Sequence, residues 1–241
     1  MNYIVVIAVV SVLILLHEIG HFVAARFLGI PIAKFSIGFG PSLWGITYGK
    51  TRYQIAALPL GGYILPAVET EEELFRIPLT KRLLFTVAGP LANLMAALFC
   101  FALLNCIVTG PSFYGVVVQP FEQITAFTSA FLRSLPFIFS DHTRLSGIIG
   151  IVAQGNAFIA GSVVKTLQFV ILLSMNFAIL NMLPIPALDG GKIVLFLLEK
   201  VHRRLLRLQV PFTIAGWVLL LALFAYTTVL DIARYIVKAF V

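Results

Sequence analysis

The chain has 241 residues, of which 60% are hydrophobic and only 11% are charged. Soluble domains are about 45–50% apolar and about 25% charged, so this composition excludes an ordinary soluble domain and a disordered chain. The net charge of +7 does not indicate a nucleic-acid partner, because the basic residues lie between apolar runs and not among stacking aromatic residues. An integral membrane protein in a lipid bilayer is the class that remains.

The first apolar run extends from Tyr3 to Leu28, which is long enough for a membrane-spanning helix. It lacks the charged start and the cleavage site of a signal peptide, so we expect a true span. The run contains His17-Glu18-Ile19-Gly20-His21. Residues four apart lie one turn apart on the same face of a helix, so His17 and His21 can bind one metal ion. Glu18 is then the candidate general base that deprotonates a metal-bound water.

These ionisable residues are unusual for their position inside a span. A charged side chain at the centre of a membrane helix costs on the order of 2–3 kcal/mol even on insertion scales, so such residues are functional by default. A purely structural polar cluster is the alternative interpretation.

A β-hairpin is predicted in the connection that follows. Residues 46–55, ITYGKTRYQI, place β-branched and aromatic residues on both sides of Gly49-Lys50, which favours a type II′ turn. The flanking segments are apolar and rich in glycine and proline. Non-helical backbone enters a membrane only where protein buries it or water reaches it, so we predict a partly membrane-embedded hairpin.

Three further spans are predicted over Leu83–Val108, Val163–Leu183 and Phe212–Leu230. The weaker run Phe121–Phe139 contains an arginine and a proline and is interpreted as an interfacial amphipathic helix. The expected fold is therefore an all-α polytopic membrane protein with four transmembrane helices, a membrane-associated β-hairpin after the first, and interfacial helices. We expect residues 1–241 to form a single domain.

Lysine and arginine residues orient these spans. They crowd the first and third connections, whereas the second carries only Arg133 and Arg144 before Lys165. The positive-inside rule then places the first and third connections in the cytoplasm and both termini outside it. The basic stretch Lys192–Arg207 is interpreted as an amphipathic helix on the anionic inner leaflet.

Catalytic zinc uses three protein ligands and one open position, so a third ligand is expected besides His17 and His21. The segment after the third span, NMLPIPALDGG, contains two prolines that end the helix and two glycines that permit a sharp turn around Asp189. The predicted topology places Asp189 and the two histidines toward the same side of the membrane. A helix-capping or turn aspartate is the alternative for Asp189.

These motifs together resemble the site-2 protease family of intramembrane zinc metalloproteases, and the bacterial RseP-type branch most of all. The resemblance rests on H-E-x-x-H at 17–21, on L-P-x-P-x-L-D-G-G at 183–191, on Ala88-Gly89-Pro90-Leu91-Ala92-Asn93 in the second span, and on Leu145–Ile151 before the third. Asn93 and Asn105 are also candidates for hydrogen bonds between helices.

The resemblance implies a zinc cofactor on His17, His21 and Asp189, with Glu18 as the catalytic residue. It implies that Asn176 and Asn181 bind substrate or stabilise the transition state. It also implies that the Phe35–Leu65 hairpin holds an unwound substrate. An exposed hairpin edge could do so by strand addition, and the residues chosen as its substrate-binding edge are Ile55, Ala56, Ala57 and Leu58.

The expected function is intramembrane zinc proteolysis of single-span membrane proteins, such as anti-sigma factors or remnant signal peptides, in the bacterial cytoplasmic (inner) membrane. RseP-type proteases carry PDZ domains between their second and third spans. Gly115–Pro120 looks like the opening of one, but about 50 residues separate the two spans here, too few for that domain plus an amphipathic helix. No PDZ domain is therefore expected. The alternative function is a membrane metal-ion transporter or a non-catalytic membrane receptor that uses the same metal cluster.

Overall fold

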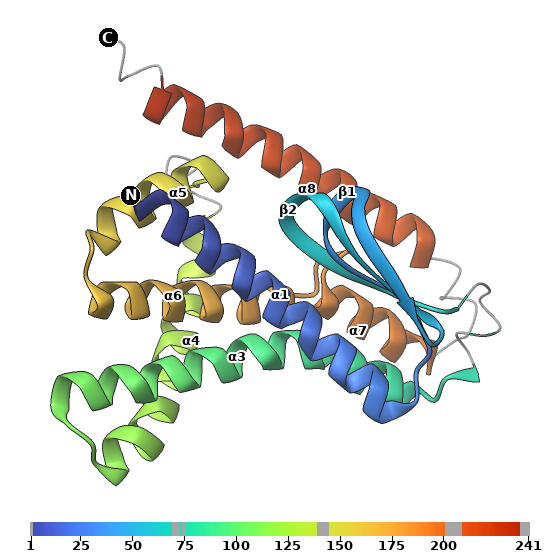
Figure 1. Ribbon diagram of the computed structural model, residues 1–241, viewed down its shortest axis with the longest axis horizontal. Coiled ribbons are helices and arrows are strands. Elements are labelled where there is room, and N and C mark those ends of the chain that lie inside the picture. Colours follow the sequence, from blue (N-terminus) through green and yellow to red (C-terminus); the bar gives the residue numbers. More distant parts are fainter. Residues whose placement is uncertain (1, 69–72, 74–75, 139–144, 201–208, 237–241) are drawn as a thin grey trace. The chain divides into compact units, whose positions relative to one another are not determined.

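The structure of the chain is a computed structural model, and it describes residues 2–68, 73, 76–138, 145–200 and 209–236. The described part is mostly helical, with one antiparallel hairpin (Figure 1). In chain order, the elements are α1 Asn2–Leu28, β1 Ile32–Tyr48, β2 Thr51–Pro66, α3 Leu79–Thr109, the π-helical turn η1 Tyr114–Val118, α4 Gln119–Ile138, α5 Ile148–Ile159, α6 Val163–Asn181, α7 Asp189–Glu199, α8 Gln209–Asp231 and the π-helical turn η4 Ile232–Ile236.

Four helices are long and apolar enough to cross a membrane, and they confirm the four predicted spans. They are α1, α3, α6 and α8, the last continuing into η4. Helix α3 begins at Leu79, before the predicted start of its span. Its first turn is tied to the end of α1, because the Lys81 ammonium donates a hydrogen bond to the carbonyl of Leu28 at 2.7 Å.

The segment between the second and third spans contains helices. The predicted amphipathic stretch forms α4, while its placement at a membrane interface stays a prediction. The segment Gly115–Pro120, which looks in sequence like the opening of a PDZ domain, forms the π-helical turn η1 and the start of α4. The Asn105 amide donates hydrogen bonds to the Gly115 carbonyl at 2.8 Å and to the Gln123 side chain at 3.1 Å. These bonds tie η1 and α4 to α3.

The hairpin has the predicted turn at its tip. Tyr48 pairs with Thr51, and Gly49 has φ +61° while Lys50 has negative φ, as a type II′ turn requires. The register is more complex than that of a simple hairpin. Residues 34–37 pair with 52–55 on one side and with 62–65 on the other, and residues 42–48 pair with the far side of 51–56. Residues 51–56 are therefore central, and 42–48 and 62–66 form the two edges.

The chain forms two compact units, and each of α1, α3, α6 and α8 contributes residues to both. One unit contains residues 1–9, 95–176 and 215–241, and the other contains residues 10–94 and 177–214. The expectation of a single domain stays a prediction. The second unit contains the H-E-x-x-H motif, the hairpin, the first half of α3 and the Asp189 segment, and it is called the hairpin unit below.

Aromatic packing fixes the base of the hairpin on α1. Phe22 of α1 contacts Phe35 and Tyr53 edge-on, with ring centroids 5.2 and 5.9 Å away. Arg26 extends over the Phe22 ring and donates a hydrogen bond to the Tyr53 hydroxyl at 2.8 Å. A buried apolar cluster around Ile30 continues this contact toward the start of α3.

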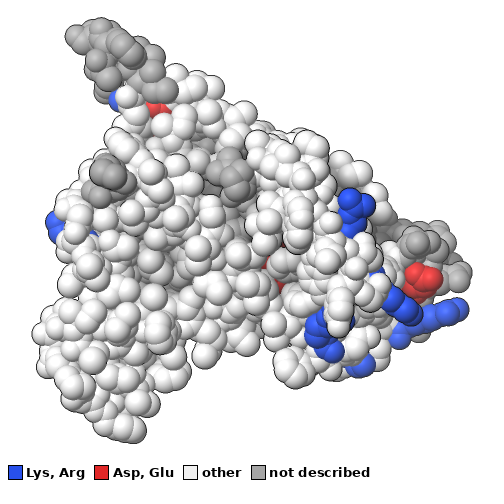
Figure 2. Space-filling model, viewed as in Figure 1, with Lys and Arg blue, Asp and Glu red and all other residues white. Residues whose placement is uncertain are grey.

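Basic side chains of the hairpin unit gather near the hairpin and the adjoining ends of α1 and α3, where Figure 2 shows most of the visible Lys and Arg. Arg26, Lys34, Arg52 and Lys81 belong to these segments. This grouping agrees with the charge distribution used to orient the first connection. Residues 201–208, which complete the basic stretch predicted after Lys192, lie outside the described residues.

Candidate metal centre

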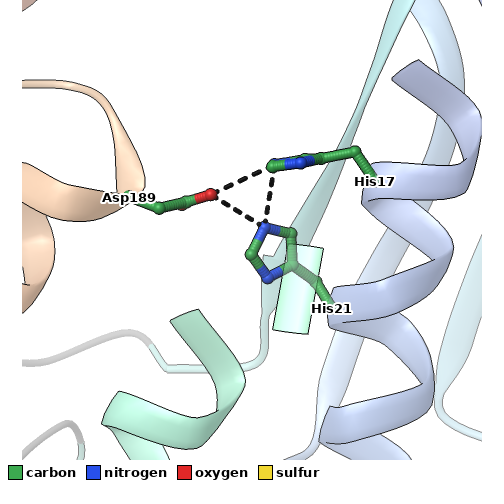
Figure 3. Close-up of side chains that lie close together, drawn as sticks. All are labelled: His17, His21 and Asp189. Carbon is green, nitrogen blue, oxygen red and sulfur yellow. Dashed lines mark hydrogen bonds and ion pairs between the residues drawn. The ribbon is translucent and has the colours of Figure 1, made fainter. Parts of the chain in front are cut away.

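Three side chains converge on one point in the hairpin unit (Figure 3). The Nε2 atoms of His17 and His21 lie 3.2 Å apart, and Asp189 Oδ2 lies 3.1 Å from the first and 3.2 Å from the second. The sequence separates Asp189 from the histidines by more than 160 residues, and the fold brings all three together as predicted.

The geometry of this triangle fits a metal ion. Tetrahedral zinc bonds of about 2.0–2.1 Å place neighbouring ligand atoms roughly 3.3 Å apart, close to the three observed distances. The residues are also buried, with exposed fractions of 9% for His17, 6% for His21 and 4% for Asp189. Two imidazole nitrogens and one carboxylate oxygen are ligands that zinc accepts, so the chemistry of the set and its spacing agree.

Small residues let α1 present its histidines directly against α3. A Cβ atom at Gly20 would lie 2.3 Å from the Ala88 carbonyl oxygen and 2.7 Å from the Ala92 Cβ. A Cβ atom at Gly89 would lie 2.3 Å from His21 Nε2 and 2.8 Å from His17 Cε1. The two helices therefore approach closely at these glycines, and Gly89 leaves the space that both imidazoles occupy.

Gly89→Ala is expected to abolish stoichiometric zinc binding while the helices remain folded. The added methyl carbon would lie only 2.3 Å from the ligand nitrogen of His21 and 2.8 Å from His17 Cε1, so both rings must move away from their present positions. Zinc content of the purified variant, together with its helical circular dichroism, checks this result. Wild-type zinc affinity in Gly89→Ala would show that the imidazoles do not lie over Gly89.

The loop before Asp189 presents its carboxylate at the first residue of α7. Pro184 and Pro186 end the helical path, and Ala187 adopts a left-handed conformation with φ +71°. The following glycines let α7 pack directly on this loop, because a Cβ atom at Gly190 would lie 2.2 Å from the Leu183 carbonyl oxygen. This close approach explains why two glycines follow the aspartate.

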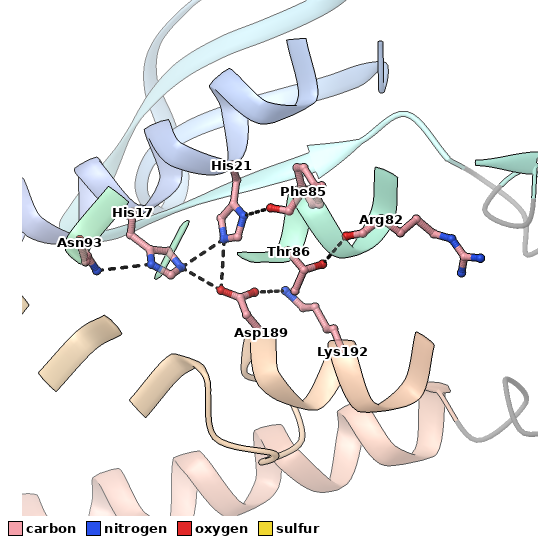
Figure 4. A network of polar contacts seen from close by, with 8 residues as sticks. All are labelled: His17, His21, Arg82, Phe85, Thr86, Asn93, Asp189 and Lys192. Carbon is pink, nitrogen blue, oxygen red and sulfur yellow. Dashed lines mark hydrogen bonds and ion pairs between the residues drawn. The ribbon is translucent and has the colours of Figure 1, made fainter. Parts of the chain in front are cut away.

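The Asp189 carboxylate has a partner on each oxygen. Oδ2 faces the two histidines, and Oδ1 accepts a hydrogen bond from the Lys192 ammonium at 3.0 Å (Figure 4). Burial alone would raise the pKa of Asp189, but hydrogen bonds from His17 and His21 and the charge of Lys192 hold this pKa well below its ordinary value. Lys192 lies one helical turn after Asp189 and had not been singled out from the sequence.

Helix α3 contacts the far side of both imidazoles. The Nδ1 atom of His21 lies 2.7 Å from the carbonyl oxygen of Phe85, and Nδ1 of His17 lies 3.4 Å from the amide nitrogen of Asn93 (Figure 4). Phe85, Gly89 and Asn93 are spaced by four residues and so share one face of α3. The contact of Asn93 with the site agrees with its place in the family-like motif, whereas the Phe85 carbonyl carries no sequence signal.

Glu18 lies between the metal-ligand set and the hairpin. It is half-buried and interacts electrostatically with His17, His21, Asp189 and Lys192. A Cβ atom at Gly62 would lie 3.1 Å from Glu18 Cγ, which places the 62–66 edge of the hairpin against this side chain. The role of Glu18 as general base stays a prediction.

The predicted substrate-binding residues are divided between the two units. Asn181 is the last residue of α6 in the hairpin unit, while Asn176 belongs to the other unit. Ile55 pairs with both Ile37 and Trp44, so it is a central position and not an edge. Ala56 is 2% exposed and pairs with Ser42, and Leu58 pairs with Phe39, with Ala57 between them. Ile55 therefore has no free edge, and the substrate-binding roles of residues 55–58 and of the two asparagines stay predictions.

Comparisons with known proteins agree with this site. A family model described as peptidase family M50 matches residues 5–224. Relatives from Synechocystis sp. and Campylobacter jejuni are each 25% identical to this chain. Their alignments cover 93% and 98% of the chain and 93% and 94% of the relatives. Both alignments extend over more positions than the chain has residues, so these relatives contain segments with no counterpart here.

A relative from Treponema pallidum is 35% identical over 130 residues, which cover 47% of this chain and 29% of that protein. A relative from Nostoc sp. is 42% identical over 106 residues, which cover 40% of this chain and 29% of that protein. These four proteins carry the name "Putative zinc metalloprotease". The family match extends across both ligand-bearing segments, His17–His21 and Asp189. The chain therefore belongs to peptidase family M50, the site-2 protease family.

Proposed function

We propose that this chain is a zinc endopeptidase that hydrolyses peptide bonds within or near transmembrane segments of single-span membrane proteins. The observation that carries the proposal is the convergence of three buried ligand atoms within 3.2 Å of one another, beside Glu18 on an apolar helix that is long enough to span a membrane. Membership in family M50 supports the same reaction class.

The residues of the site have different proposed roles in peptide hydrolysis. His17, His21 and Asp189 would hold zinc, which supplies Lewis acidity toward a water molecule and toward the scissile carbonyl. Glu18 accepts the proton of the attacking water as general base and returns it to the leaving amine. Lys192 occupies Asp189 Oδ1 and leaves Oδ2 for the metal site. This arrangement keeps the carboxylate in one orientation.

The hairpin is proposed to enter the membrane and to bind the substrate backbone. Its 42–48 edge exposes apolar side chains, with exposed fractions of 72% for Leu43, 60% for Trp44 and 74% for Tyr48, a surface suited to lipid. An unwound substrate segment can extend the sheet at the 62–66 edge, because this edge pairs only with β1 among the described residues. The edge is also near Glu18, since a Cβ atom at Gly62 would lie 3.1 Å from Glu18 Cγ. This edge replaces Ile55–Leu58 as the proposed docking strand.

Proline substitutions at successive positions of the two edges test this docking. Successive backbone N–H groups point to opposite edges of a strand, so only one of Tyr63→Pro and Ile64→Pro removes an N–H that faces away from β1. That variant is expected to slow cleavage of a membrane substrate, because the docking edge loses a backbone donor to the added substrate strand. Matched prolines at Trp44 and Gly45, on the opposite edge, should leave the cleavage rate unchanged. Equal effects at both edges, or none at either, would contradict docking at 62–66.

The proposed location is the bacterial cytoplasmic membrane, with both termini outside the cytoplasm. The concentration of Lys and Arg in the first and third connections supports this orientation, and the named relatives are bacterial. Anti-sigma factors and remnant signal peptides, which are single-span membrane proteins or peptides, are the proposed substrate classes.

Reconstitution in liposomes tests the function against metal transport. The purified protein, loaded with zinc, is expected to cleave a single-span model substrate, and a chelator should stop the reaction. Radioactive zinc added outside the same liposomes should remain outside. Zinc uptake without cleavage would favour the transporter interpretation over the proposed protease.

A further inference from the structure

The Asn93 side chain is completely buried at the centre of the hairpin unit, and only half of its amide is paired. Its Nδ2 atom lies 3.4 Å from Nδ1 of His17. Its Oδ1 atom is buried and has no hydrogen-bond partner among the described residues. A buried amide oxygen without a partner is costly, so this arrangement needs an explanation.

The chemistry of a metal-bound imidazole supplies one. A neutral histidine that binds a metal through Nε2 carries its hydrogen on Nδ1, and that N–H needs an acceptor. His21 has such an acceptor in the Phe85 carbonyl, 2.7 Å away. The contact of His17 Nδ1 is the Asn93 amide. With the hydrogen on His17 Nδ1, this N–H would face the Asn93 Nδ2 amide group, which is also a hydrogen-bond donor. Two donors that face each other cannot form a hydrogen bond.

A half-turn of the Asn93 amide removes this donor–donor conflict. It exchanges Nδ2 and Oδ1, which are nearly equal in size, so no other atom has to move. The oxygen then accepts the His17 Nδ1–H and gains the hydrogen bond that it lacks. In the present orientation the amide donates to an unprotonated Nδ1, which suits the ring when Nε2 carries the hydrogen.

We propose that Asn93 is a positioning residue of the metal site, whose amide oxygen accepts a hydrogen bond from His17 Nδ1 and fixes the tautomer that binds metal through Nε2. The inference rests on the proposed metal site. One face of α3 then orients both imidazoles, through the Phe85 carbonyl for His21 and through Asn93 for His17, while Gly89 between them leaves the rings room.

Metal affinity of the resting protein tests the proposal. Zinc affinity is measured by competition with a chromophoric chelator, and the ligand field is followed with Co²⁺. The variant Asn93→Leu, of similar size but without an acceptor, is expected to bind zinc about 10–100-fold more weakly, as loss of an outer hydrogen-bond partner usually does. Asn93→Asp retains an acceptor and should keep the wild-type affinity and Co²⁺ spectrum.

Asn105→Leu is the matched control, because Asn105 is another buried asparagine of α3 that bonds to Gly115 and Gln123 in the other unit. It should leave zinc affinity unchanged. Wild-type affinity in Asn93→Leu would overturn the proposal, and so would equal losses in Asn93→Leu and Asn93→Asp. If Asn93→Leu does not fold, a reduced affinity in Asn93→Asp alone overturns it.

All variants are prepared in a Glu18→Gln background, so the readout does not depend on proteolysis. Failure of the protein to cleave any substrate would refute the proposed function and leave the affinity comparison intact. Wild-type affinity in Asn93→Leu would refute only the role of Asn93.

Discussion

Replacing Glu18 with glutamine is expected to lower the rate of substrate cleavage by about 10²–10⁴-fold, the usual contribution of a general acid–base group. Glutamine matches glutamate in size but cannot accept the proton of the attacking water. The carboxylate of Glu18 is not among the three converging ligand atoms, so zinc stoichiometry should remain at the wild-type value. Cleavage of a single-span substrate and zinc content are measured on the same preparation.

The two readouts separate the proposed role of Glu18 from a structural one. Loss of both cleavage and zinc would indicate that Glu18 supports the fold or binds the metal. Full cleavage in Glu18→Gln would mean that another group takes the proton, and the proposed mechanism would be wrong.

Replacing Asp189 with asparagine is expected to remove both zinc binding and cleavage. The change removes the anionic oxygen that lies within 3.2 Å of both histidines, while asparagine has nearly the same size and shape as aspartate. The loss of zinc affinity should exceed the about 10–100-fold typical of an outer hydrogen-bond partner, because a direct ligand is lost. Chelator competition measures this affinity.

A second buried aspartate provides the control. Asp231 is 0% exposed at the end of α8, and its Oδ2 accepts a hydrogen bond from the Gly150 amide at 2.7 Å. Asp231→Asn should lower stability and leave zinc stoichiometry unchanged, since Asp231 lies outside the converging set. Equal zinc affinities in Asp189→Asn and the wild type would place the third ligand elsewhere.

The sequence predicts local features of this molecule well. The four spans follow from apolar runs of sufficient length, and the turn at Gly49-Lys50 follows from glycine's access to positive φ. His17 and His21 are placed together by helical periodicity alone. Asp189 required a further step, because only the motif and the predicted topology linked it to the first span.

Features that depend on how distant segments pack were less accessible. Helix α5 was not predicted. Ile55 is central because it pairs with both Ile37 and Trp44, whereas the two-residue turn suggested a simple hairpin with a free edge there. The Phe85 carbonyl is a backbone group that no residue type reveals. The hydrogen bond from Lys192 to Asp189 depends on α7 beginning at Asp189, which the sequence does not predict.

The position of the cut bond tests the central claim most directly. The zinc-loaded protein is incubated in lipid nanodiscs with a single-span substrate, and the masses of both products locate the hydrolysed bond. We predict a cut within or beside the membrane segment that disappears with a chelator and in Glu18→Gln. Cleavage only in the soluble part of the substrate, or cleavage that persists with the chelator and in Glu18→Gln, would contradict the account.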